Sequence, residues 1–264
     1  MSDLKLLGRG RTADVFVWAP GHVLKLFHAG RSADEAAQEA RLTCAVYAAG
    51  LPVPQVEDMD IVEHAGRYGF VCEQITGPTL LSEMTMKPWT LFRAAHLLAE
   101  LQVKISACSV PGLPSQRKKL QHAIASAQQL SPIARQAAQH ALAQLPDGTQ
   151  LCHGDFHPDN VMLTQRGPVI LDWAAATCGN ALGDVMRTSM LLRSASPTGS
   201  AAQRRLIQLG RALFHQLYLR RYLSRQRHSV ADVNTWALPI YAARLKEGIL
   251  DERDLLERLV NELL

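Results

Sequence analysis

The stretch CHGDFHPDNVMLTQRGPVILDW, residues 152–173, concentrates polar and ionisable side chains in a short length of chain. These side chains are His153, Asp155, His157, Asp159, Asn160 and Asp172. Two apolar runs, 161–163 and 169–171, accompany them and have the length of buried strands. Polar groups in such a place are either turn-formers on a surface loop or members of a functional site.

The spacing within this stretch favours a site. Pro158 cannot continue a helix or a central strand, so we expect residues 155–160 to form a loop of fixed conformation. If 161–164 and 168–172 form a hairpin over Gly167, Asp172 returns close to Asn160. Turn formation alone would also explain the Asp, Asn and Pro residues, but it requires three separate spacings to arise by accident.

The residue types also suit a particular chemistry. A carboxylate and an amide oxygen, here from Asp172 and Asn160, are hard ligands of the kind that bind Mg²⁺ together with substrate phosphates. Asp155 then remains to orient a hydroxyl group and accept its proton.

An aspartate, an asparagine five positions later and a following metal-binding aspartate form the catalytic pattern of kinases. His153-Gly154-Asp155 stands in place of H-R-D, and Asp172-Trp173 in place of the start of D-F-G. "HGDFHPDN" with "ILDW" resembles the aminoglycoside phosphotransferase and choline kinase family, and the resemblance covers about residue 4 to about residue 245. It implies an ATP- or GTP-dependent, Mg²⁺-dependent kinase acting on a hydroxyl of a small metabolite or antibiotic.

The resemblance also implies an α+β, two-lobed, protein-kinase-like fold. The expected lobes are a small N-terminal antiparallel β-sheet lobe with one helix and a larger, mainly helical C-terminal lobe. The hydrophobic pattern of the sequence agrees with this two-lobed fold. Short apolar stretches broken by Gly and Pro fill the first 75 residues, and helical periodicity follows Gly77-Pro78. We therefore expect a nucleotide-binding β lobe at 1–75 and a helical lobe with the catalytic loop and acceptor pocket at 76–264.

Local signals place several elements. Ser32 and Glu35 predict a capping box, and Gly50 predicts the end of the helix that begins there. Ala65-Gly66 predicts a hairpin between two short strands. Ser131 with Pro132 predicts another helix start. Periodic apolar residues predict helices at 89–107 and throughout the chain after residue 181.

The sequence "GRGRTADVF", residues 8–16, stands where the family has its glycine-rich loop. By resemblance, Gly8, Gly10, Arg11 and Thr12 hold the nucleotide phosphates, although a G-x-G in a hairpin is often only a turn. Ala13 replaces the third glycine of the pattern. The loop precedes a strand rather than a helix, which argues against a dinucleotide-binding turn.

Lys25 lies in the apolar run 22–30, where an isolated lysine would usually extend its ammonium to solvent. By resemblance it is the lysine that pairs with phosphate oxygens. Its best partner from the following helix is Glu39. Glu35 is the alternative, but the capping box already explains it.

Five further residues are assigned from the resemblance or from local chemistry. "FVCEQITG", residues 70–77, resembles the hinge, so an adenine would meet backbone groups near Glu73 and Ile75. Asp184 matches an aspartate that organises the catalytic loop, and a carboxylate at a helix N-terminus explains it equally well. His153 and His157 are expected to brace the loop, since zinc would require another His or Cys nearby besides Cys152.

Composition narrows the class of protein. With 47% hydrophobic and 20% charged residues among 264, the chain reads as an ordinary globular protein. Five scattered cysteines indicate free thiols in a reducing compartment, and no signal peptide or membrane span is apparent. We therefore expect a cytoplasmic protein without a membrane partner.

The charge distribution is one-sided. Residues 185–231 contain nine arginines and no carboxylate. This indicates either plain surface basicity or attraction for an anionic ligand, and no motif or interleaved aromatic pattern supports nucleic acid. We predict a small hydroxyl acceptor that is neutral or anionic rather than polycationic. The alternative is an acidic wall for a cationic acceptor, supplied by Asp232 and by the carboxylates of 247–262.

Two rival functions remain at this stage. A protein Ser/Thr kinase would need an activation segment, but only about ten residues separate Asp172 from the helix expected near 182. A nucleotide-binding regulator without catalysis would have lost matched polar positions, and all are filled. The sequence leaves open the acceptor's identity, ATP against GTP, a role in antibiotic resistance and the oligomeric state.

Overall fold

The computed structural model describes residues 4–194 and 200–264, which divide into two units. The first unit takes Met1–Ser82 and Asp159–Ala174, and the second takes Glu83–Pro158 and Ala175–Leu264. The first unit is thus built from two stretches that are distant in sequence. The predicted division into lobes at 1–75 and 76–264 stays a prediction.

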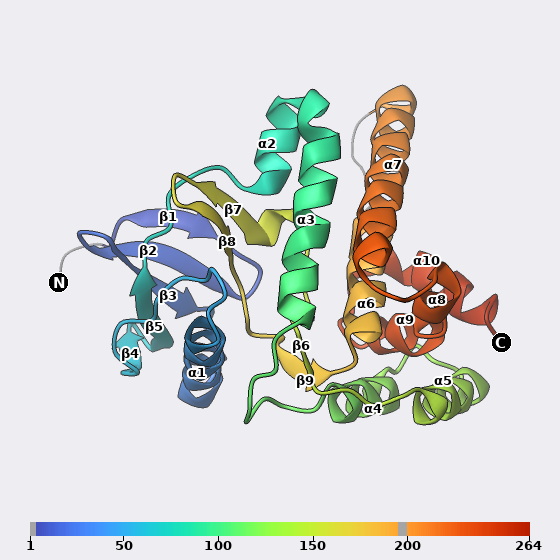
Figure 1. Ribbon diagram of the computed structural model, residues 1–264. Coiled ribbons are helices and arrows are strands. Elements are labelled where there is room, and N and C mark those ends of the chain that lie inside the picture. The colour runs from blue at the N-terminus through green and yellow to red at the C-terminus, as the bar shows by residue number, and fades with distance from the viewer. Residues whose placement is uncertain (1–3, 195–199) are drawn as a thin grey trace. The chain divides into compact units, whose positions relative to one another are not determined.

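An antiparallel sheet of five strands dominates the first unit, in the order β1-β2-β3-β5-β4 (Figure 1). Its strands are β1 (Leu6–Arg9), β2 (Ala13–Ala19), β3 (His22–Phe27), β4 (Val62–His64) and β5 (Arg67–Glu73). The predicted hairpin between β4 and β5 is present, and Ala65 and Gly66 both have positive φ, 50° and 72°. That geometry matches the twist of the two strands.

Helix α1 (Ala33–Ala48) packs on this sheet. The Ser32 hydroxyl accepts the Glu35 N–H and the Glu35 carboxylate accepts the Ser32 N–H, so the predicted capping box is confirmed. Ala36 and Ala40 are fully buried against Phe27 and Phe70. Small residues on this face let the helix approach the sheet closely.

The second stretch of the first unit forms the predicted hairpin. Strands β7 (Val161–Thr164) and β8 (Gly167–Ile170) pair antiparallel, with Thr164 opposite Gly167. The turn is therefore Gln165-Arg166, whereas the sequence suggested a turn over Gly167 and a second strand at 168–172. Val161 and Ile170 are fully buried. The two apolar runs of the opening sequence are therefore buried strands.

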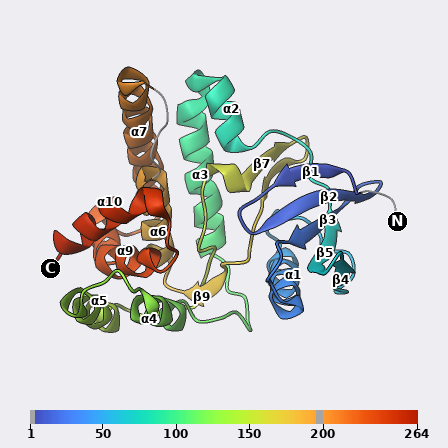
Figure 2. The same ribbon diagram turned by 180° about the vertical axis from the view of Figure 1, so that it is seen from behind.

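The second unit is mainly helical (Figures 1 and 2). Its longer helices are α3 (Leu91–Ser106), α4 (Gln116–Ser126), α5 (Pro132–Gln144), α6 (Ala181–Ser194), α7 (Ala201–Arg225), α9 (Ala237–Leu245) and α10 (Leu250–Asn261). Its shorter elements are the 3₁₀ turn η1 (Pro88–Thr90), the paired strands β6 (Gln150–Cys152) and β9 (Thr177–Gly179), and α8 (Val230–Asn234). Two elements cross the division between the units along the chain, α2 (Leu80–Met86) and the 3₁₀ turn η2 (Pro158–Asn160).

A buried polar cluster stabilises the middle of the second unit. Helices α3 and α7 lie side by side in both views (Figures 1 and 2). Gln102 of α3 is fully buried, donates to Asp184 and Thr188 of α6, and accepts from Tyr218 of α7. Because each buried group has a partner, the cluster fixes the register of three helices.

The α+β class predicted from the sequence is confirmed, with an antiparallel sheet first and a mostly helical remainder. In the part of the chain that the structure describes, no helix combines the length and apolarity that crossing a membrane requires.

Candidate active site

Lys25 lies on β3 and forms ion pairs with two carboxylates of the first unit. Its Nζ contacts Glu39 Oε1 of α1 and, at 3.2 Å, Asp172 Oδ1. Burial opposes the charge on the ammonium, but the Glu39 and Asp172 carboxylates outweigh it and raise the pKa of Lys25. Glu35, the alternative partner, bonds to Ser32 and Arg31 instead. Lys25 is therefore a fixed cation with a defined partner.

Asp172 owes its position to the backbone on either side of it. The Leu171 N–H donates to Asn160 O at 2.8 Å, which brings the end of the hairpin beside Asn160. Trp173 is fully buried, and its indole N–H donates to Ile170 O. Between these anchors Asp172 has φ 62°, a left-handed conformation that Asp tolerates better than most residues.

The donor set around Asp172 fits a divalent cation. Its side chain is 38% exposed, and only Oδ1 meets Lys25. The second carboxylate oxygen has no partner among the residues that the structure describes. A half-exposed carboxylate beside an asparagine is the hard oxygen chemistry that Mg²⁺ takes.

The predicted phosphate loop forms the turn between β1 and β2. The Gly10 N–H donates to Ala13 O at 2.9 Å, and Gly8 and Arg11 are exposed. Ala13, which replaces the third glycine of the pattern, is 3% exposed and packs in the core with Phe27. The departure from the glycine pattern is thus explained by packing of the sheet on α1.

The predicted hinge lines a groove of about 710 Å³ in the first unit. Residues 73–78 form one wall and residues 163–166, the turn of the β7–β8 hairpin, form the other. Glu73 and Ile75 both belong to this lining. Glu73 also forms an ion pair at 2.6 Å with Arg166, which sequence reasoning did not single out.

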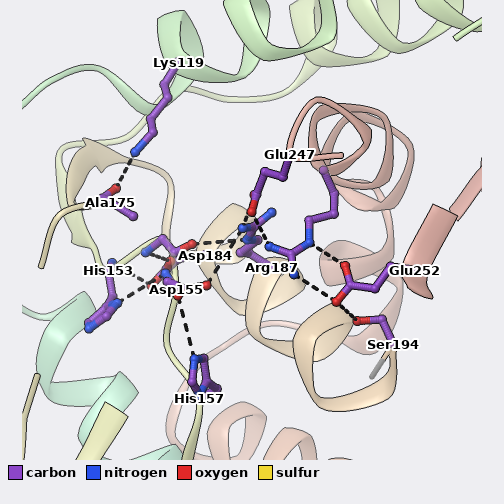
Figure 3. A network of polar contacts seen from close by, with 12 residues as sticks. Lys119, His153, Asp155, His157, Ala175, Asp184, Arg187, Ser194, Glu247 and Glu252 are labelled. Atoms are coloured by element: carbon purple, nitrogen blue, oxygen red, sulfur yellow. Dashed lines mark hydrogen bonds and ion pairs between the residues drawn. The ribbon is translucent and has the colours of Figure 1, made fainter. Parts of the chain in front are cut away.

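Asp155 lies in the loop after β6, in the second unit (Figure 3). Its Oδ2 is 3.7 Å from His157 Nε2, and its Oδ1 is 3.9 Å from Arg187 Nη2. Burial alone would raise its pKa, but the contact with His157 and the charge of Arg187 hold the pKa of Asp155 well below its usual range. Asp155 is therefore ionised and able to accept a proton.

Asp184 braces the backbone on the N-terminal side of Asp155. Its carboxylate accepts the N–H groups of His153, at 3.0 Å, and Gly154, at 2.7 Å (Figure 3). The His153 ring nitrogen Nδ1 in turn accepts the Asp155 N–H at 3.2 Å. Of the two explanations left open for Asp184, organisation of the catalytic loop is the one that these bonds support.

Sequence reasoning missed the cationic side of this loop. Arg187 of α6 donates through Nε to Gly154 O at 3.2 Å and pairs with Glu247 at 2.5 Å. Glu247 also accepts from Arg244, which forms a buried bidentate pair with Glu252 (Figure 3). The sequence shows Arg187 only as one of the nine arginines in 185–231, because no motif spacing connects it with the Asp155 loop.

The site residues predicted from the sequence divide between the two units. The first unit contains those assigned to the nucleotide and the metal: Gly8, Gly10, Arg11, Thr12, Lys25, Glu39, Glu73, Ile75, Asn160 and Asp172. The second contains Asp155. Within the first unit the structure brings Lys25, Glu39 and Asp172 into direct contact.

A small antiparallel sheet with one helix, followed by a mainly helical remainder, defines a protein-kinase-like fold. The chain belongs to the phosphotransferase enzyme family, whose model matches residues 3–222. Family and fold together make it an ATP-dependent phosphotransferase that acts on an alcohol group.

Solved structures of aminoglycoside phosphotransferases share this fold. A thermostable mutant of aminoglycoside phosphotransferase APH(4)-Ia, in a complex with AMP-PNP and hygromycin B, has a TM-score of 0.67 and 18% identity, covering 98% of this chain and 93% of its own. Aminoglycoside-3'-phosphotransferase of type VIII has a TM-score of 0.66 and 16% identity, covering 94% of each chain. The GDP complex of aminoglycoside 2'-phosphotransferase-IIIa has a TM-score of 0.60 and 18% identity, covering 99% and 92%. A search of curated proteins gave no significant match.

Proposed function

We propose that the protein is a small-molecule kinase that transfers the γ-phosphate of ATP, or of GTP, to a hydroxyl group of a small metabolite. The observation that carries the proposal is the Lys25 ammonium in contact with both Glu39 and Asp172. A fixed lysine with a helix glutamate, next to an aspartate suited to a metal, is what kinases use on a triphosphate.

Different residues would bind the nucleotide with its metal and activate the acceptor hydroxyl. Lys25 and the turn at 8–12 would hold the phosphates, and backbone near Glu73 and Ile75 would hold the base. Asn160 and Asp172 would hold Mg²⁺, which when bound neutralises charge on the phosphates. Asp155 would orient the acceptor hydroxyl and take its proton.

The low pKa of Asp155 is compatible with this role. Phosphoryl transfer in most analyses passes through a loose transition state, in which positioning and charge stabilisation matter more than strong base catalysis. A weakly basic carboxylate is then sufficient to align the hydroxyl.

The structure supports a neutral or anionic acceptor. Relatives of known structure were crystallised with hygromycin B or kanamycin, and such polycations need carboxylates for recognition. Here Glu247, near Asp155, is paired with Arg187 and Arg244, and Glu252 is paired with Arg244. Two acidic groups of the C-terminal region are thus already neutralised by arginine.

A panel of hydroxyl compounds, scored by ADP release with Mg²⁺ present, tests the function. The panel should include sugars, hydroxy acids, amino alcohols, aminoglycosides and a Ser/Thr peptide, with ATP and GTP as donors. We expect turnover with a neutral or acidic small molecule. Efficient turnover of kanamycin-like compounds alone, or of the peptide alone, would contradict the proposed acceptor class. Absence of turnover with every acceptor would instead support a catalytically silent regulator.

Replacement of Asp155 tests its assignment. Asp155→Asn should lower turnover by ~10²–10⁴-fold and leave nucleotide affinity nearly unchanged. The matched control is Asp159→Asn, because Asp159 lies in the same loop but accepts from Thr79. Turnover of Asp155→Asn within threefold of wild type would remove Asp155 from the role.

A further inference from the structure

Lys119 of α4 is a cation that has no acidic partner within the described part of the chain. Its Nζ donates to Ala175 O at 2.9 Å (Figure 3). Among the residues that the structure describes, no carboxylate lies within ion-pair distance of it. An ammonium has three N–H donors, so two remain available to a ligand.

The backbone carbonyl that fixes Lys119 also touches the Asp155 loop. Gly154 has φ 79°, and a Cβ atom at this position would lie 2.6 Å from Ala175 O. No side chain fits there, so the Gly154 backbone packs directly on the carbonyl that accepts Lys119. The Lys119 ammonium is thereby held close to the backbone next to Asp155.

Arg187 supplies a second cation at the same loop, but a carboxylate, that of Glu247, already balances its charge. Its guanidinium bonds to Gly154 O and pairs with Glu247. Arg187 therefore shapes the loop, whereas Lys119 keeps donors for a molecule from solution.

Electrostatics around Lys119 favour an anion. Removal of water from its ammonium lowers the pKa of Lys119, and the positive charge of Arg187 lowers it further. Glu247 and Asp155 oppose this effect without reversing it. A cation in such surroundings gains stability from an anionic ligand placed against it.

We propose that Lys119 binds an anionic group, a carboxylate or a phosphate, on the acceptor whose hydroxyl Asp155 activates. The inference rests on the proposed function and deepens it, because it names the chemical class of the acceptor. Lys119 donates to the Ala175 carbonyl, and the backbone of Gly154, the residue before Asp155, packs on the same carbonyl, so one small molecule carrying a hydroxyl and an anionic group can meet both side chains.

Amine labelling tests the site without turnover. Wild-type protein is acetylated at pH 8 with inorganic phosphate, glycerate or glycerol present at equal ionic strength, and modified lysines are quantified by mass spectrometry. We expect phosphate or glycerate to slow labelling of Lys119 several-fold and glycerol to leave it unchanged. Lys118 is the internal control, and Lys25 reports binding of the anion at the nucleotide site. Equal labelling of Lys119 in all three solutions would overturn the proposal, even if the enzyme is an active kinase.

Kinetics then distinguish acceptor from nucleotide. The acceptors are matched pairs: glycerate against glycerol, glycerol 3-phosphate against glycerol, and gluconate against glucose. Lys119→Met should lower kcat/KM for the anionic member by about 10–100-fold, the loss expected for a charged hydrogen bond, and leave the neutral member within twofold. Lys118→Met should change neither. An equal loss on both members, or a rise in the KM for ATP in place of the acceptor effect, would overturn the assignment. The carboxylate and phosphate pairs show which anion is preferred.

Discussion

Lys25 is the cation of two ion pairs in the first unit, so its replacement should impair nucleotide use. Lys25→Met should raise the KM for ATP or lower turnover by about 10–100-fold, since charge-assisted hydrogen bonds to phosphates are lost. Glu39→Gln should do the same less strongly, because Lys25 retains Asp172. Steady-state kinetics with varied ATP provide the measurement.

The matched control for Glu39 is Glu35→Gln, one helical turn earlier on α1. Glu35 serves the capping box and Arg31, so its loss should leave the kinetics unchanged and lower stability by at most ~1 kcal/mol. Damage from Glu35→Gln with a silent Glu39→Gln would show that the wrong glutamate has been assigned to Lys25.

Asp172 offers a separate test of the metal. Asp172→Asn should weaken nucleotide binding in the presence of Mg²⁺ and leave binding without Mg²⁺ nearly unchanged, because one of two predicted oxygen ligands loses its charge. Asparagine tolerates the left-handed backbone at this position, so the fold should persist. Calorimetric titration of nucleotide with and without Mg²⁺ is decisive, and an unchanged difference between the two titrations would exclude Asp172 as a ligand.

The site residues that could be predicted from the sequence are those that lie at a recognisable spacing from one another along the chain. Asn160 and Asp172 flank one hairpin, and Lys25 precedes the helix that carries Glu39. Arg187 and Lys119 come from two helices that approach the Asp155 loop only through tertiary packing. No local pattern marks such residues, because the loop contacts of Arg187 and Lys119 are to backbone carbonyls, at Gly154 and Ala175, and the Glu247 partner of Arg187 lies 60 residues further along the chain.

Helices α9 and α10 are joined by a buried ion pair whose loss should be costly. The side chains of Arg244 and Glu252 are 5% and 8% exposed, and they share two hydrogen bonds. Glu252→Gln should destabilise the protein, but by less than the about 3–5 kcal/mol expected when a buried charge is left wholly uncompensated, because Arg244 keeps its pair with Glu247. Urea denaturation followed by circular dichroism measures this change.

A neighbouring pair on α10 supplies the comparison. Arg253 and Glu257 form an exposed pair at 2.8 Å, so Glu257→Gln should cost less than ~1 kcal/mol. Similar losses from Glu252→Gln and Glu257→Gln would mean that burial does not set the strength of the inner pair.

Helix and hairpin boundaries were predictable where a cap or turn residue marks them, as at Ser32, Ala65-Gly66 and Ser131. The start of the helix expected at 89–107 was predicted less accurately, because a 3₁₀ turn, Pro88–Thr90, precedes α3, which begins at Leu91. The pairing of β6 with β9 could not be predicted, since residues 150–152 and 177–179 are short segments that meet only through long-range packing.

The charge of the second unit predicts how salt affects catalysis. The stretch 185–231 contains nine arginines and no carboxylate, and three of them, Arg187, Arg221 and Arg225, form ion pairs with Glu247 or Glu100. The remaining positive charge should attract anions from a distance, and this attraction weakens as the screening length falls from about 10 Å at 0.1 M salt to about 3 Å at 1 M. The KM for an anionic acceptor should therefore rise with added potassium chloride, while the KM for a neutral acceptor stays constant. A KM for the anionic acceptor that does not depend on salt would show that these arginines do not act on it.

The hairpin β7–β8 belongs to the same unit as the five-stranded sheet, although residues 83–158 separate them in sequence. During synthesis the strands of the five-stranded sheet leave the ribosome before the β7–β8 hairpin has been made. At about 5–20 residues per second, roughly 4–15 s pass before residue 159 is made. At the end of that interval α3, α4 and α5 of the second unit have been made, whereas α6 to α10 have not. We therefore expect the nascent sheet to depend on chaperones or on slow, late closure. Codon changes that alter translation speed across 83–158 should then alter the yield of folded enzyme without changing a single amino acid.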